Sequence, residues 1–586
     1  MDDYLIVSIS KASDQAVALT GQLRRLAMES GGRVSSLSAA TWLWETARRP
    51  QMPTRVGLWL LVGDVVRRQT TARSESSLHQ PEREARALTQ DFWGRYVGVR
   101  LSERGSVTAV LRDPSGAREC LVWSQGGLAI IGSTAPAWLA HRFIPNWSVN
   151  IERVGQAMID PLMSAGALML DGPVAVNPGV FQPLPAERPG TTVWSPVERA
   201  RSSLSDWTPT EAADRLRCAV DEAVNGLGGL PGTLAVEISG GLDSSIVATS
   251  LAASTRDRVK IWLNAYGARP EADERQYVEA LGKVLGVSPV SVPHFTAPLT
   301  EALFTRISQD VRPGLNALDI HHDLDWSARL GSVGADAVLT GKGGDSILLH
   351  SAGLLVAADR WRREGWKSLL SGDFVSLAAN NEMSVWTLIA SARRARNRPS
   401  DRIQLDDTLL RRRLGLGPIH PWLEGSDAYG PAKIFQIAGV VDSVSRHGRS
   451  LLTDAVDVRH PLCAQPVVEA GLALPTPLLT LGGWSRGLAR VAFRDRLPAI
   501  IAERRTKGDM TAIYGRMVFE NLDLFKSWLL DGRLAAEGLL DRAAVEARLN
   551  RENLMWRGGG GGAHTIIRAA AFEGWLRVWS DRLKGG

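Results

Sequence analysis

The chain has 586 residues, of which 44% are hydrophobic and 22% charged, with a formal net charge of +6. This composition is typical of a globular protein, and the length predicts two or more domains. The sequence shows no apolar run of membrane-spanning length, no signal-peptide pattern and no basic run interleaved with aromatic residues. We therefore expect a cytoplasmic protein that binds neither membrane nor nucleic acid.

The cysteines point to neither a disulfide framework nor a structural zinc site. Cys120, Cys218 and Cys463 are far apart and lack the spacing of metal ligands.

Short strand-like runs dominate the first part of the chain. They lie at residues 4–8, 57–62, 92–101, 107–111 and 128–132. Their spacing predicts a layered, β-rich domain with flanking helices. A linker follows, and Thr208 or Thr210 is expected to cap the helix that opens the next domain. We place the two domains at residues 1–205 and 206–586.

The most specific stretch is the loop from Ser239 to Ser245, which reads Ser-Gly-Gly-Leu-Asp-Ser-Ser after the apolar run 234–238. We predict a buried strand, a glycine turn and the start of a helix, where backbone N–H groups and hydroxyls can bind phosphate. Asp243 would repel phosphate unless it holds a Mg²⁺ that bridges to pyrophosphate. The alternative is a strand–turn–helix corner without a ligand.

Strands and helices alternate after this loop. Strand-like runs at 259–264, 290–292 and 335–340 and a helix at 274–285 predict a parallel sheet. A second glycine loop, Thr340-Gly-Lys-Gly-Gly-Asp345, follows the last strand. Asp243 and Asp345 would then lie at the carboxyl ends of two parallel strands and could share Mg²⁺. A turn without a ligand is the alternative here too.

The loop from Ser239 to Ser245 resembles the pyrophosphate-binding loop of the ATP-pyrophosphatases. Within that group the chain resembles asparagine synthetase, β-lactam synthetase and the lasso-peptide macrolactam cyclases. The resemblance implies an α/β synthetase domain that uses ATP and Mg²⁺ to activate a carboxylate as an acyl-adenylate, which an amine then attacks. It implies Mg²⁺ binding by Asp243 and Asp345. Nucleotide binding is implied for Ser239, Gly240, Gly241, Asp243, Ser244, Ser245, Asn264, Thr340 and Gly341.

The first 205 residues carry a weaker resemblance to the glutaminase domain of asparagine synthetase, a layered α+β domain. It rests on Leu111-Arg-Asp-Pro-Ser-Gly and on the stretch from Leu170 to Pro185. Glutaminases of this family need cysteine as the processed N-terminal residue, whereas position 2 is Asp2 and the first cysteine is Cys120. We expect a domain without glutaminase activity, so that the substrate itself supplies the amine.

Four residues are candidates for catalysis. Lys342 stands where asparagine synthetase has glutamate and β-lactam synthetase has tyrosine, and we interpret it as a cation that neutralises phosphate or developing charge. Asp457 and Arg459 resemble the family's Glu-x-Arg-x-Pro segment and are interpreted mainly as an ion pair near the site. Lys507 matches the family's phosphate-contacting lysine. A solvated lysine and a helix C-terminus are the alternatives for Lys342 and Lys507. The general base stays unidentified.

Two further regions are less specific. The Arg-rich stretch 392–413 is either a solvated surface or a docking surface for an acidic peptide. The tail predicts helices at 535–549 and 563–583, separated by five glycines at 558–562.

The chain most resembles a lasso-peptide cyclase, because of the missing cysteine, Lys342, the extra length and the divergent tail. Such an enzyme joins the N-terminal amine of a precursor peptide to an Asp or Glu side chain, with a leader peptidase as its partner. The alternatives are a small-molecule ligase of the asparagine or β-lactam synthetase type, and an inert peptide-binding relative.

Overall fold

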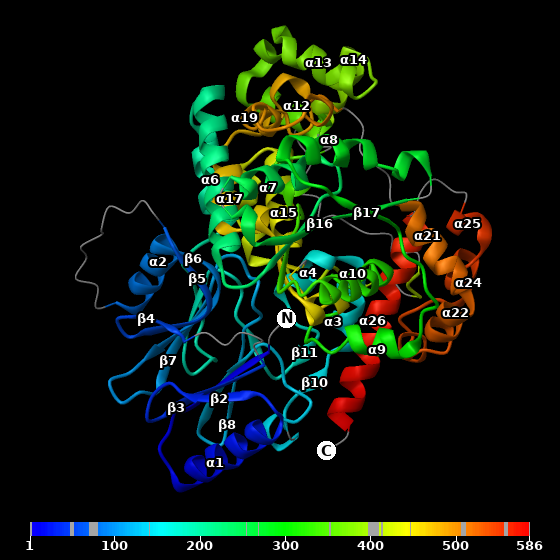
Figure 1. The fold of residues 1–586 in the computed structure, drawn as a ribbon. Helices are drawn as coiled ribbons and strands as arrows, with labels where there is room; N and C mark the ends of the chain where they lie inside the picture. Colours follow the sequence, from blue (N-terminus) through cyan, green and yellow to red (C-terminus); the bar gives the residue numbers. More distant parts are fainter. Residues whose placement is uncertain are drawn as a thin grey trace.

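The structure is a computed structural model in which antiparallel sheets form the first part of the chain and a parallel sheet the second (Figure 1). It describes residues 3–46, 52–68, 80–139, 141–253, 255–267, 269–350, 353–395, 409–411, 414–445, 447–504, 511–555 and 561–584. None of the helices in these ranges combines the length and the apolar content that a membrane span requires. The predicted fold class, α/β with a layered N-terminal part, is confirmed.

The N-terminal part contains two six-stranded antiparallel sheets. The first has the order β12 (Val174–Ala175), β8 (Leu121–Gln125), β9 (Leu128–Gly132), β1 (Tyr4–Ile9), β3 (Thr41–Glu45) and β2 (Arg33–Ser36). The second has the order β14 (Thr191–Thr192), β13 (Val180–Pro183), β7 (Val107–Arg112), β6 (Phe92–Leu101), β5 (Trp59–Arg67) and β4 (Thr54–Val56). All strands expected from the sequence are present.

These two sheets pack face to face because their strands alternate in hydrophobicity. Ile6 and Ile131 of the first sheet share one buried cluster with Val97 and Val110 of the second. Helix α1 (Asp14–Glu29) packs on the outer side of the first sheet, and α2 (Pro81–Asp91) packs against the second. The result is the layered arrangement predicted for this region.

Smaller elements complete the N-terminal part. They are α3 (Ile151–Ile159), α4 (Pro161–Gly166), α5 (Pro196–Arg199) and the strand pair β10 (Ser148–Val149) and β11 (Leu170–Asp171). The domain boundary that we predict near residue 205 falls just before α6 (Pro209–Gly229), whose N-cap is Thr208 in a capping box with Glu211.

The second part is built on a five-stranded parallel sheet with the order β17 (Val290–Pro293), β16 (Val259–Tyr266), β15 (Leu234–Glu237), β18 (Ala337–Leu339) and β19 (Asp457–Arg459). The strand order changes direction at β15, so that β16 lies on one side of it and β18 on the other. Ligands of open α/β sheets bind at such a switch point, outside the carboxyl ends of the strands.

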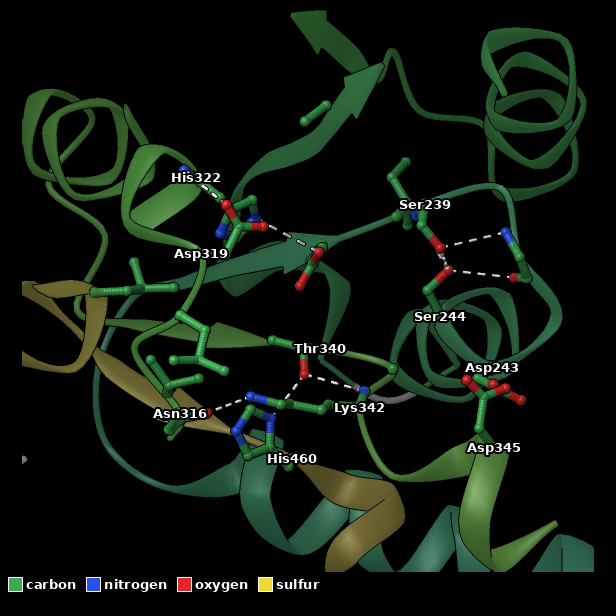
Figure 2. Close-up of a pocket in the computed structure, with 18 of the residues that line it drawn as sticks. Ser239, Asp243, Ser244, Asn316, Asp319, His322, Thr340, Lys342, Asp345 and His460 are labelled. Carbon is green, nitrogen blue, oxygen red and sulfur yellow. Dashed lines mark hydrogen bonds and ion pairs between the residues drawn. The ribbon is translucent and has the colours of Figure 1, made fainter. Parts of the chain in front are cut away.

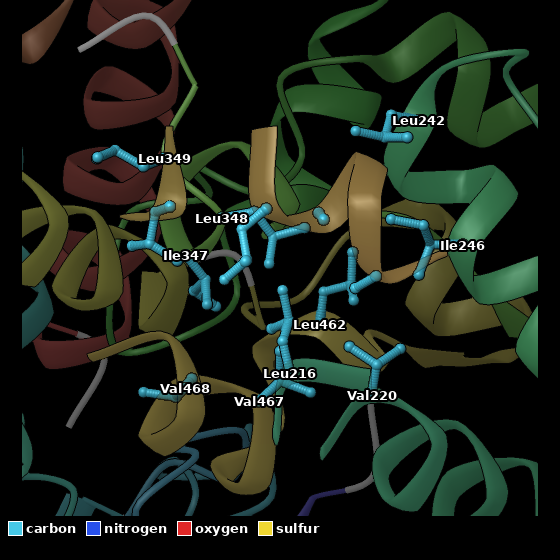
Figure 3. Packing of buried hydrophobic residues seen from close by; sticks show 14 of the residues in the cluster. Leu216, Val220, Leu242, Ile246, Ile347, Leu348, Leu349, Leu462, Val467 and Val468 are labelled. Carbon is cyan, nitrogen blue, oxygen red and sulfur yellow. The ribbon is translucent and has the colours of Figure 1, made fainter. Parts of the chain in front are cut away.

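Helices cover both faces of this sheet. Leu234 and Val236 of β15 share a buried cluster with α6, α7 (Leu242–Ala252) and α8 (Arg275–Leu285), part of which Figure 3 shows. Ala235 faces the opposite way, toward α10 (Ile320–Ser332) and α16 (Leu451–Ala455). Because side chains alternate along a strand, Glu237, two residues after Ala235, lies on the same side of the sheet as Ala235.

The remaining helices surround this core. They are α9 (Glu301–Ile307), α11 (Gly344–Ile347), α12 (Gly353–Glu364), α13 (Gly372–Asn380), α14 (Val385–Ala395), α15 (Pro431–Ser445), α17 (Gln465–Ala473), α18 (Thr476–Leu479), α19 (Gly487–Ala492) and α20 (Ala499–Ala502). Figure 1 shows α12, α13 and α14 together at one end of the molecule.

The tail folds into α21 (Thr511–Glu520), α22 (Leu522–Leu530), α23 (Arg533–Ala536), α24 (Arg542–Arg548), α25 (Arg551–Met555) and α26 (Gly561–Lys584). The predicted helix 563–583 is confirmed as α26, which stacks Trp579 on Trp147 of the N-terminal part at 6.0 Å. The predicted helix 535–549 is wrong, because Gly538 adopts a φ of +71° and Asp541 caps a new helix, α24.

Candidate functional site

A cavity of about 820 Å³ lies at the carboxyl ends of the parallel strands. Residues near the end of every strand line it: Glu237 at the end of β15 and Ser239 beyond it, Asn264 near the end of β16, His294 after β17, Thr340 after β18 and His460 after β19. This is the position at which open α/β sheets bind their ligands. The N-terminal ends of α7 and α10 also line the cavity.

The first glycine loop forms the turn that the sequence predicts. The hydroxyl of Ser244 accepts a hydrogen bond from the backbone N–H of Ser239 at 3.1 Å and lies 3.0 Å from the Ser239 hydroxyl. Ser239, Gly241, Asp243 and Ser244 all line the cavity. Backbone N–H groups at the start of α7 therefore border a hollow large enough for a nucleotide, as expected for an anion site.

The second glycine loop touches the first so closely that side chains would not fit. A Cβ atom on Gly341 would lie 2.4 Å from the backbone nitrogen of Ser244, and one on Gly344 would lie 2.4 Å from Cγ of Asp243. Glycine at these two positions therefore lets the loop after β18 press against the start of α7. This contact brings Asp345 next to Asp243 (Figure 2).

The two predicted Mg²⁺ ligands converge on a single cation, the guanidinium of Arg486. Its Nη1 donates to Oδ2 of Asp243 at 2.7 Å and to Oδ1 of Asp345 at 3.0 Å. Asp243 is nearly buried, whereas Asp345 is 45% exposed. The pair fits Mg²⁺, which proteins bind through one or two carboxylates together with substrate phosphates. Within the described ranges no group of three or more acidic, His or Cys side chains could hold a metal ion.

Two more arginines lie at this end of the cavity, beside the carboxylates of Asp243, Asp345 and Glu274. Arg504 pairs with Glu274 at 2.6 Å and donates to the carbonyl oxygen of Gly240 at 3.4 Å. Arg490 donates to the carbonyl oxygen of Ala502 at 2.7 Å. Burial, together with the neighbouring Arg486, lowers the pKa of Arg490 to about 10. Arg486, Arg490 and Arg504 all line the cavity and were missed as site residues in the sequence, because only their fold brings them to the loop.

Three predicted nucleotide-binding residues are placed differently from one another. Ser245 is fully buried and its hydroxyl donates to the carbonyl oxygen of Gly241 at 2.8 Å, so it stabilises the turn instead of facing the cavity. Gly240 packs against the start of α8. Asn264 lines the cavity, and its amide nitrogen donates to the carbonyl oxygen of Ile238 at 3.0 Å.

Thr340, Gly341 and Lys342, the first residues of the second glycine loop, line the cavity. The hydroxyl of Thr340 lies 2.7 Å from Nδ1 of His460 and accepts a hydrogen bond from the backbone N–H of Lys342 at 3.2 Å. The ammonium of Lys342 donates to Oδ1 of Asn316 (Figure 2). Lys342 is therefore held in the cavity by a defined contact.

Asp457 and Arg459 form the ion pair that we expected, at 2.8 Å, on the edge strand β19. Neither is among the described residues that line the cavity, whereas their strand neighbours Val458 and His460 are. Arg459 instead donates to the carbonyl oxygen of Leu227 at 2.7 Å. Their placement favours a structural role over the catalytic one that we also assigned to them, because alternation along β19 turns them away from the cavity.

Other predictions fall outside the described residues. They concern Lys507, most of the Arg-rich stretch 392–413 and most of the glycine tract 558–562.

The end of the cavity opposite the glycine loops is acidic, and sequence reasoning missed it. His322 lies 3.8 Å from Oε1 of Glu237 and 3.6 Å from Oδ1 of Asp323, while His294 lies 3.8 Å from Asp319. Burial opposes protonation of His322, but Asp323, Asp319 and Glu237 outweigh it and raise the pKa to about 9. Figure 2 shows His322 and Asp319 across the cavity from Ser239, Asp243 and Asp345. The signal that the sequence offered for this acidic end was Glu237, a charged residue at the end of an apolar strand.

Comparison with known proteins identifies the family. No curated protein matches the sequence. A family model described as asparagine synthase matches residues 215–577, which include the parallel sheet, both glycine loops, Arg486 and the helix α19 that carries Arg490. The match spans more than half of the chain, and members of this family are ATP-dependent ligases that form AMP and pyrophosphate. The chain therefore belongs to the asparagine synthase family.

Proposed function

We propose that this protein is an ATP- and Mg²⁺-dependent macrolactam synthetase of the lasso-peptide cyclase type. It would adenylate an Asp or Glu side chain of a precursor peptide and join it to the N-terminal amine of the same peptide, with release of AMP and pyrophosphate. A leader peptidase would act on the precursor in the same pathway. The observation that carries the proposal is the division of one cavity into an end with three arginines and two converging aspartates at the glycine loops and an acidic end at α10.

The end of the cavity at the glycine loops suits a triphosphate with its metal ion. Arg486, Arg490 and Arg504 surround the start of α7, where backbone N–H groups attract anions. A bound Mg²⁺, held by Asp243 and Asp345, would neutralise charge on the departing pyrophosphate. Arg486 lies between the two carboxylates, and its guanidinium is also suited to bind a phosphate oxygen of the nucleotide.

The acidic end suits an amine. Glu237, Asp319 and Asp323 face the cavity with His322, and Lys342 of the second glycine loop lines the same cavity. The substrate carboxylate would attack the α-phosphorus near Lys342, and the amine would approach the acyl-adenylate from the acidic side. Placing both reactants in one cavity of about 820 Å³ favours an intramolecular reaction through proximity and orientation.

The N-terminal part supports an amine that comes from the substrate. Its cysteine, Cys120, is completely buried, and burial raises the pKa of its thiol to about 12. A protonated, buried thiol is a poor nucleophile. Cys120 therefore offers no route to ammonia from glutamine.

The test is ATP–pyrophosphate exchange, followed by mass spectrometry of the product. A linear precursor peptide should stimulate exchange and lose one water on ring closure, while free aspartate should stimulate neither. Exchange with aspartate and ammonia would instead indicate a small-molecule ligase. Absence of exchange with every carboxylate, while the peptide still binds, would indicate a peptide-binding protein without ligase activity.

The matched control is a peptide with its acceptor Asp or Glu changed to Asn or Gln. It keeps the size and nearly the shape of the substrate but has no carboxylate to adenylate. It should bind without stimulating exchange.

A further inference from the structure

Glu237 is an unusual residue for its position in the fold. It is the last residue of the central strand β15, directly after the fully buried Leu234, Ala235 and Val236. A carboxylate at the end of such a strand is costly unless other groups compensate for its burial. The side chain is 29% exposed and lines the cavity, so the compensation and the remaining access both come from the cavity side.

A defined set of groups faces Glu237. His322 of α10 lies 3.8 Å from its carboxylate, and Asp323 holds the other nitrogen of the same imidazole at 3.6 Å. The His322 ring also stacks on Trp326 with centroids 4.6 Å apart, which fixes its orientation. Asp319 caps α10 and accepts a hydrogen bond from the backbone N–H of His322 at 3.3 Å. Asp323 and Trp326 thus hold the imidazole toward Glu237, and Asp319 holds the backbone that carries it.

We propose that Glu237 is the general base of ring closure and that His322 is the residue that positions it. The proposal rests on the proposed function, because it concerns the amine that attacks the acyl-adenylate. Glu237, Asp319 and Asp323 would receive this amine as a cation. The second glycine loop offers Lys342 at this place, whose ammonium donates a hydrogen bond to Oδ1 of Asn316 and is not a base.

The proton balance of the step is simple. The amine arrives as an ammonium ion and loses its first proton to water. Its nitrogen then forms the C–N bond to the acyl carbon, the C–O bond to the phosphate of AMP breaks, and the electron pair leaves on AMP. The second proton of the nitrogen passes to the carboxylate of Glu237. Burial raises the pKa of Glu237, which improves its ability to take up a proton near neutral pH.

The two half-reactions separate this role from any role in ATP binding. Glu237→Gln should lower the rate of ring closure by about 100-fold or more, because general bases contribute that much. ATP–pyrophosphate exchange, which needs no amine, should stay within about threefold of the wild type. Hydroxylamine, which is mostly uncharged at neutral pH, should still trap the acyl-adenylate as a hydroxamate in the variant. The control is Glu279→Gln, an exposed glutamate of α8 that does not line the cavity.

Two outcomes would overturn the proposal. One is ring closure by Glu237→Gln at the wild-type rate, and the other is an equal loss of exchange and closure. If Glu237→Gln does not fold, Glu237→Asp, which keeps the carboxylate but shortens it, should slow closure and leave exchange intact. His322→Gln should slow closure less than Glu237→Gln. No exchange in the wild-type protein would reject the proposed function instead.

Discussion

Asp243 and Asp345 accept hydrogen bonds from the same nitrogen of Arg486, at 2.7 and 3.0 Å. The two carboxylates belong to loops that follow different strands of the parallel sheet, β15 and β18. Arg486 adopts a φ of +56°, a backbone conformation that a residue with a side chain seldom takes, and it is nearly buried. The fold therefore holds a cation at the point where both acidic side chains meet, and the same point suits Mg²⁺ once phosphate is present.

Replacing the more exposed of the two carboxylates should disable adenylation without unfolding the protein. We expect Asp345→Asn to lower Mg²⁺-dependent ATP–pyrophosphate exchange by about 100-fold, because charge stabilisation at a departing phosphate is lost. Exchange measured over a range of Mg²⁺ concentrations checks this. Asp325→Asn, which removes a carboxylate of α10 paired with Arg329, is the control and should behave like the wild type. Unchanged exchange in Asp345→Asn would contradict the metal assignment.

The contact between the two glycine loops should be sensitive to a single methyl group. Gly341→Ala would place Cβ 2.4 Å from the backbone nitrogen of Ser244, so the loops must separate. We expect a loss of about 1–3 kcal/mol in the free energy of unfolding, measured with urea, together with weaker ATP binding. Gly331→Ala in α10, where a Cβ meets nothing within 4 Å, should be neutral or stabilising. Equal stability of the two variants would refute the close contact.

The sequence was sufficient to predict the elements that depend on local patterns. Both glycine loops, the parallel strands around them and the Thr208 cap are encoded in short strings whose chemistry is local. Strand β19 was not predicted as a strand, because it has only three residues and too little length for a periodic pattern. The helix predicted across Gly538 was wrong although the segment is long enough for a periodic pattern. Periodicity alone does not reveal that a glycine adopts a left-handed conformation.

Contacts between distant segments were beyond prediction. Arg486 and Asp243 are separated by 243 residues, and nothing in either segment specifies the other. The same holds for His322, whose neighbour Glu237 lies on another element. The acidic end of the cavity therefore emerged only from the fold, although a glutamate at the end of a buried strand was a visible anomaly.

The stability that the contact between the two parts of the chain provides should depend on pH, because Glu119 forms ion pairs in both parts. Its carboxylate pairs with Arg112 of the N-terminal part at 2.7 Å and with Arg312 of the second part. Burial opposes ionisation, but the two arginines outweigh it and lower the pKa of Glu119 from 4.5 to about 2. Because the pKa is lower in the folded state, the stabilisation is complete above pH 4.5 and is lost as the pH falls toward 2.

We therefore expect Glu119→Gln to lower the free energy of unfolding by about 3 kcal/mol at pH 7, since it leaves two largely buried arginines without their carboxylate partner. The difference between variant and wild type should shrink as the pH falls below 4.5. Urea unfolding at several pH values measures both effects. A difference that grows on acidification would show that the sign of the linkage is wrong.

Lys507 lies outside the described residues, but Arg504, shortly before it in the chain, contacts the first glycine loop at Gly240. We predict that Lys507→Ala lowers exchange by about 100-fold through loss of a positive charge near the phosphates. Lys507→Arg should retain more activity because it keeps the charge. Lys283→Ala, at the exposed end of α8, is the control. Equal exchange by the Lys507→Ala and Lys283→Ala variants would remove Lys507 from the site.

The charge of Lys342 should affect the pKa of Glu237, the proposed general base. Burial raises the pKa of Glu237, His322 and Lys342 oppose this rise, and Asp319 and Asp323 add to it. Removing the charge with Lys342→Met should therefore raise the pKa of Glu237 further.

A general base works only when it is ionised, so the acidic limb of the pH profile of ring closure should move to higher pH in Lys342→Met. The measurement is the closure rate of a preformed acyl-adenylate over a range of pH values, which isolates the second half-reaction. Lys283→Met should leave the limb in place, because its side chain lies outside the cavity. A shift to lower pH would mean that Lys342 does not act on the group that limits closure. The Glu237→Gln variant should lose the limb altogether, whether or not Lys342 is present.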